Sequence, residues 1–182
     1  MTRTPLTSLG LARYVARMGC LRVLLAIPAG LVVMGLTVWL LELLSHAIFP
    51  ASPEMQAAIQ QYVRDPASPA ALDAIKLAIP TMPPASYIML AAAWTIGTLS
   101  GSYAAARIAA PRRNGPAGVV GIISIAAIAT NVNAIPHPEW MQSPAIYLLP
   151  FGACICGSLL AKAHAEGRTR RPADEHAGSP AR

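Results

Sequence analysis

The sequence predicts an all-α membrane protein with four transmembrane helices, both termini in the cytoplasm and two short helices on the outer side. Hydrophobic residues make up 54% of the 182 residues, and charged residues only 12%. The apolar residues form four blocks that each hold at least 18 successive uncharged residues, the length that a helix needs to cross a bilayer. This composition excludes a soluble enzyme, a disulfide-stabilised domain and a β-barrel.

The four predicted spans cover residues of about 23–49, 86–106, 116–135 and 144–161, and with an outer loop at 50–85 they form a transmembrane domain over 23–165. The first block has 19 uncharged residues before Glu42 interrupts it, which is longer than the apolar part of a signal peptide. An even number of spans leaves both termini on the same side of the membrane.

The positions of Lys and Arg predict which side that is. Of the 14 basic residues, Arg64 and Lys76 lie between spans one and two. The other 12 lie before span one, between spans two and three, or after span four. Because basic loops stay in the cytoplasm, the protein is predicted to be N-in and C-in.

The outer loop is predicted to form a lid of two short helices. Ser52-Pro53 and Ser68-Pro69 each place an N-cap serine before a proline in the first helical turn. Apolar residues then recur at helical spacing and give each helix one apolar face. These residues are Met55, Ile59, Tyr62 and Val63 in the first helix and Leu72, Ile75 and Ile79 in the second.

The two ends of the chain have different predicted roles. Residues 1–22 combine apolar residues with Arg13 and Arg17, as a basic helix at the cytoplasmic membrane surface does. Residues 166–182 show no apolar periodicity, and we expect a disordered cytoplasmic tail.

Small residues mark the expected helix contacts. Ala93, Gly97, Gly101 and Ala105 recur every four residues in span two, and Gly157 belongs to a similar series in span four. Glycine is unfavourable inside a helix unless close packing requires it. We therefore expect these stripes to face neighbouring helices.

Polar side chains near the outer end of the spans form the candidate site. Glu42 and His46 lie four residues apart on span one, and ionisable groups inside a span usually mark a functional site. Span three and the loop after it bring further polar groups to the same depth. They are Asn131, Asn133, His137 and Glu139. We expect Glu42, His46, Asn131 and His137 to converge beneath the lid.

Three interpretations of this polar group are open. In the first, Glu42 pairs with His46 and orders the lid. In the second, the polar group binds a proton or a small solute, and in the third it binds a metal ion. The spacing of these residues matches no metal motif, so we predict neither a metal nor a cofactor. Cys20, Cys154 and Cys156 contain no CxxC pair that would change this prediction.

Parts of the sequence resemble an uncharacterised group of small bacterial four-span inner-membrane proteins. The segments that carry the resemblance are 42–50, Ala93-Trp94 with the small-residue stripe that follows, and 133–140. The resemblance implies a multi-pass protein of the bacterial inner (plasma) membrane, and it implies no mechanism.

The sequence favours a non-enzymatic subunit or scaffold that packs through its small-residue faces. The alternative is a small-solute or proton transporter that uses the outer Glu/His/Asn pocket. No nucleophile with a base and no phosphate-binding loop indicates an enzyme. The expected partners are the lipid bilayer and a second copy or another membrane protein, and no basic groove with aromatic residues indicates nucleic acid.

The charge asymmetry generates a topology prediction. A cysteine introduced at Ala67, in the lid, should react with a membrane-impermeant thiol reagent from outside the cell. A cysteine introduced at Asn114, between spans two and three, should react only after permeabilisation. The opposite labelling pattern would refute the N-in, C-in arrangement.

Overall fold

The structure, a computed structural model, describes residues 8–110, 114–135 and 137–177, with side chains over 19–110, 114–135 and 137–167. All regular structure in these ranges is helical. Four long helices pack against one another and are called the bundle here: α1 (Ser8–Ile48), α4 (Pro84–Ile108), α5 (Asn114–Ala134) and α6 (Pro144–Ala177). Helix α4 contacts each of the other three.

Three helical segments are long and apolar enough to cross a membrane. They are Gly19–Ile48 in α1, the whole of α5, and Pro144–Gly167 in α6. The chain therefore has the helices of a membrane protein, and three of the predicted spans fall on these segments. The remaining predicted span, 86–106, lies within α4.

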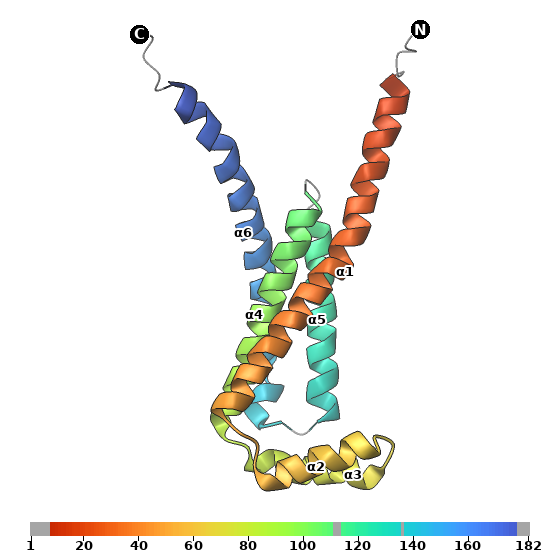
Figure 1. The fold of residues 1–182 in the computed structure, drawn as a ribbon, viewed down its shortest axis with the longest axis vertical. Coiled ribbons are helices and arrows are strands. Elements are labelled where there is room, and N and C mark those ends of the chain that lie inside the picture. The colour runs from red at the N-terminus through yellow and green to blue at the C-terminus, as the bar shows by residue number, and fades with distance from the viewer. Residues whose placement is uncertain (1–7, 111–113, 136, 178–182) are drawn as a thin grey trace.

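Short helices form the lid between α1 and α4. They are α2 (Pro53–Arg64), α3 (Pro69–Ala78) and the 3-10 helix η1 (Ile79–Thr81), and they lie across the end of the bundle opposite both termini (Figure 1). The Ser52 hydroxyl accepts a hydrogen bond from the Met55 amide at 3.2 Å, as predicted for an N-cap. Ser68 also stands at a helix N-cap, but its side chain makes no capping hydrogen bond, so that part of the prediction is wrong.

The lid is attached to the bundle at the two ends of its sequence. Met55 and Ala58 at the start of α2, and Ile79 in η1, are buried in one apolar cluster with residues of the bundle. The Tyr87 hydroxyl of α4 donates a hydrogen bond to the Ile79 carbonyl at 2.6 Å. Other members of the predicted apolar faces stay exposed, namely Ile59, Tyr62, Val63 and Leu72.

Two helices continue beyond the bundle. Helix α1 is continuous from Ser8, so the predicted interfacial segment and the first span share one helix, and α6 diverges from it on the other side (Figure 1). Helix α6 reaches Ala177, so the prediction of disorder from residue 166 is wrong up to that residue. Ala, Glu and Arg in this stretch favour a helix, whereas Gly167 and Pro172 do not. Residues 1–7, 111–113, 136 and 178–182, which include basic residues counted for the topology, lie outside the described residues.

Glycines allow α1 and α4 to approach closely. A Cβ atom added to Gly101 would lie 2.7 Å from the Gly30 carbonyl oxygen, and one added to Gly30 would lie 2.8 Å from the Gly101 carbonyl oxygen. A Cβ on Gly97 would lie 2.5 Å from Val38. The prediction that Gly97 and Gly101 face another helix is confirmed, and that helix is α1 of the same chain.

The remaining small residues of the stripes pack in the same way. Ala93 and Ala105 are buried in α4. A Cβ on Gly157 of α6 would lie 2.5 Å from the Leu99 carbonyl oxygen of α4. The small-residue faces therefore join helices within this chain.

Hydroxyl groups of α4 bind the helices on both sides of it. Ser100 donates a hydrogen bond to the Thr37 hydroxyl of α1 at 3.0 Å. Thr98 and Ser124 of α5 share a buried hydrogen bond. Such bonds satisfy polar groups that would otherwise face hydrocarbon, so the polar residues of α4 belong at the centre of the bundle.

The glycine contact generates a stability prediction. In Gly101→Ala the new methyl group meets the Gly30 carbonyl oxygen, which belongs to a backbone and cannot turn aside. Overpacking of this kind typically costs about 1–3 kcal/mol, so thermal stability in detergent should fall. Gly118→Ala in α5 is the control, because nothing lies within 4 Å of its added Cβ. Equal stability of the two variants would contradict a close α1–α4 contact.

Candidate functional site

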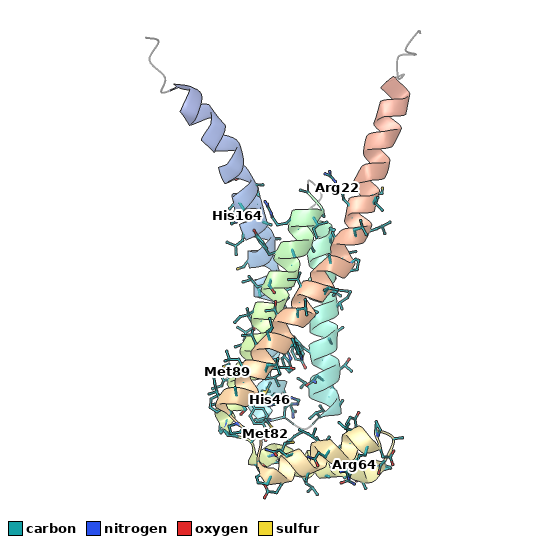
Figure 2. The ribbon with its side chains drawn as sticks, in the orientation of Figure 1. Arg22, His46, Arg64, Met82, Met89 and His164 are labelled. Atoms are coloured by element: carbon teal, nitrogen blue, oxygen red, sulfur yellow. The ribbon has the colours of Figure 1, made fainter. Side chains whose placement is uncertain are left out.

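A cavity of about 270 Å³ lies where the bundle meets the lid, and we call it the lid cavity. Four of the six predicted polar residues line it: Glu42, His46, Asn131 and His137. Ile79 and Met82 close it from the lid side. His46 lies at the lid end of α1, in the same region as Met82 and Met89 (Figure 2).

Glu42 and His46 enter the cavity from α1. Glu42 is half-buried, whereas His46 is exposed. Within the ranges that the structure describes, no ion pair or hydrogen bond joins the two side chains, but His46 lies near enough to interact electrostatically with the Glu42 carboxylate. The Glu42 carboxylate can therefore still accept a hydrogen bond from a further partner, and an ionisable group inside a span usually marks a functional site.

His137 enters the cavity from the loop after α5 and is held in place. Its Nδ1 lies 2.7 Å from the Ile135 carbonyl oxygen. Because a carbonyl only accepts, Nδ1 carries the proton, and Nε2 of the neutral ring is an acceptor. The ring packs against Tyr87 and Trp94, with centroids 6.3 Å away in each case. These contacts leave one imidazole nitrogen for a ligand or proton.

Ser86 of α4 is a site residue that the sequence did not reveal. It lines the lid cavity and is 6% exposed, and its hydroxyl has no hydrogen-bond partner among the described residues. An unsatisfied buried hydroxyl costs about 1–3 kcal/mol. No local pattern distinguishes Ser86 from other serines of the chain, because its burial depends on how α4 is turned in the bundle.

Two predicted residues do not join the cavity. Asn133 is exposed and donates a hydrogen bond to the Ala129 carbonyl at 2.7 Å. Glu139 is exposed in the 3-10 helix η2 (Glu139–Gln142). Asn133 lies outside the cavity because of helical geometry. A step of two residues turns the side chain by about 200° around the helix axis, so Asn131 and Asn133 point to different sides of α5. Their inclusion in the predicted pocket was wrong.

The chemistry available in the lid cavity is that of one carboxylate, two imidazoles, one amide and three hydroxyls, which belong to Ser45, Ser86 and Tyr87. Among the residues whose positions are described, no group of three or more His, Cys, Asp or Glu side chains is arranged to hold a metal ion. The cavity can bind a proton, a cation or a small solute that forms hydrogen bonds. No protein-family model, no curated protein and no solved structure matches the chain.

The unpartnered hydroxyl generates a paired prediction. Ser86→Ala removes an unsatisfied polar group, so the ligand-free protein should keep its stability or gain up to about 1 kcal/mol. Ser102→Ala is the matched control, because Ser102 is also buried in α4 but donates to the Ala117 carbonyl at 3.4 Å. That control should lose about 0.5–1.5 kcal/mol. Thermal unfolding in detergent compares the two, and an equal loss in Ser86→Ala would mean that its hydroxyl has a partner.

Proposed function

We propose that this chain is a four-span protein of the bacterial plasma membrane that carries a small solute or protons by way of the lid cavity. The observation that carries the proposal is the meeting of Glu42, His46, Asn131 and His137 in one cavity that also contains the unpartnered Ser86 hydroxyl. Polar groups without partners are costly in a membrane protein unless function requires them.

Helix α4 is the fourth span in this proposal. Its 25 residues extend about 37 Å, which exceeds the hydrocarbon thickness of a bilayer. Its serines and threonines make it less apolar than its neighbours, but Thr98, Ser100 and Ser102 form hydrogen bonds with neighbouring helices. A span surrounded by other helices needs fewer apolar side chains than one that faces lipid.

The orientation in this proposal is N-in and C-in, with the lid on the outer side. Its support is the distribution of basic residues, since only Arg64 and Lys76 lie in the segment that joins α1 to α4. The placement in the bacterial inner membrane rests on the resemblance to small four-span proteins. The lid cavity then opens towards the periplasm.

A transport role ranks above a subunit role because of where the small residues lie. Gly97, Gly101 and Gly157 are all occupied by neighbouring helices of the same chain. They are not free to bind a partner, which removes the main argument for a scaffold. The polar side chains Glu42, His46 and Asn131 of the lid cavity, by contrast, are not part of these glycine contacts.

A subunit of a larger membrane assembly is the second candidate. The observation in its favour is that α1 and α6 diverge beyond the bundle (Figure 1). A second copy or another membrane protein is then the partner. We do not propose an enzyme, because the cavity offers no nucleophile activated by a base.

Flux measurements test the transport role. The full chain is reconstituted in proteoliposomes that contain a pH-sensitive dye, and a membrane potential is imposed. Wild type should move protons, alone or with added solutes, and Glu42→Gln should reduce the rate at least tenfold. Glu54→Gln is the control, since Glu54 is an exposed lid residue and its loss should leave the rate unchanged.

Two outcomes would contradict the proposal. Equal flux in wild type and Glu42→Gln would exclude the lid cavity from the path. No flux, together with purification in a fixed ratio with another membrane protein, would favour the subunit role.

A further inference from the structure

A second cavity continues from the lid cavity into the bundle, and we call it the bundle cavity. Its volume is about 300 Å³. Both cavities are lined by Glu42 and Asn131, so they meet at these two side chains. On α1 the lining continues from Glu42 back to Met34, a distance of about 12 Å along the helix.

The bundle cavity differs from the lid cavity in its chemistry. Beside Glu42 it has two tryptophan rings, Trp39 of α1 and Trp94 of α4, and aliphatic groups of Val38 and Ile128. Both histidines of the site line the lid cavity alone. The Glu42 carboxylate is therefore the one ionisable group on the described wall of the bundle cavity.

The charged residues that line the two cavities indicate which charge a ligand carries. No Lys or Arg lines either cavity among the described residues. Phosphate and carboxylate ligands usually require such donors, so an anionic headgroup is a poor match. A carboxylate beside aromatic faces is the arrangement that binds organic cations, because the negative face of each ring attracts the positive charge.

The size and polarity of the two cavities favour an amphiphilic ligand. Cavities of this size that are mostly apolar, with a few polar groups at one end, are typical of small-molecule sites. Trp39 is 55% exposed, so the bundle cavity reaches the surface that faces lipid in the proposed topology. Trp94 is 9% exposed and also contacts the His137 ring, which connects the two cavities.

We propose that the two cavities form one binding site for a lipophilic organic cation, such as a quaternary ammonium or phosphonium compound. Glu42 neutralises the cation, Trp39 and Trp94 contact its charged centre, and its apolar body lies in the bundle cavity. A polar substituent reaches the lid cavity, where Ser86 and Asn131 offer hydrogen bonds. This inference rests on the transport role proposed above and names the class of solute.

Titration calorimetry of tetraphenylphosphonium with the full chain in detergent tests this inference. Wild type should bind it, Glu42→Gln should bind at least tenfold more weakly, and Trp39→Leu should bind several-fold more weakly. Glu54→Gln should match wild type. Tetraphenylborate, an anion of the same shape, controls for simple partition into apolar space and should not bind.

Each result bears on the inference. Equal binding of tetraphenylphosphonium by wild type and Glu42→Gln, or binding of tetraphenylborate with similar affinity, would overturn a cation site. Absence of tetraphenylphosphonium binding in a protein that still shows Glu42-dependent proton flux would overturn the ligand class and leave the transport role intact. Absence of both would overturn the two proposals together. Circular dichroism of each variant confirms that a lost signal is not lost folding.

Discussion

Helices α1 and α4 cross with Gly30 and Gly101 in mutual contact, and the position of every functional group depends on this crossing. Each glycine lies against the carbonyl oxygen of the other, so neither helix can move without opening a gap or a clash. The two helices run in opposite directions from this point. Glu42 lies about 18 Å further along α1, and Ser86 about 22 Å back along α4, so both reach the lid end.

Polar groups in the bundle fall into two classes. Thr98, Ser100 and Ser102 are paired across helix contacts and hold α4 between its neighbours. Ser86 lies beyond these contacts and its hydroxyl has no hydrogen-bond partner within the described residues, and Glu42 lines the same cavity. Since a membrane offers no water to either class, the second class identifies where the protein can receive a ligand.

The lid completes the site because of how it is attached. Burial of Met55 and Ile79 fixes the two ends of the lid sequence against the bundle, and the Tyr87 hydrogen bond holds η1 over the cavity. Ala74 and Ile75 of α3 also pack against the same apolar cluster. The wall that η1 forms is therefore fixed, although much of α2 stays exposed.

The sequence by itself determined the helices, the lid and the depth of the polar residues, because spans, prolines and serine caps are local features. It placed Glu42, His46, Asn131 and His137 at one level, and all four line the lid cavity. Only the tertiary structure decided which side of each helix faces inward. That rotation excluded Asn133, buried Ser86 and set Gly30 against Gly101, because contacts between distant residues fix it and no local pattern records them.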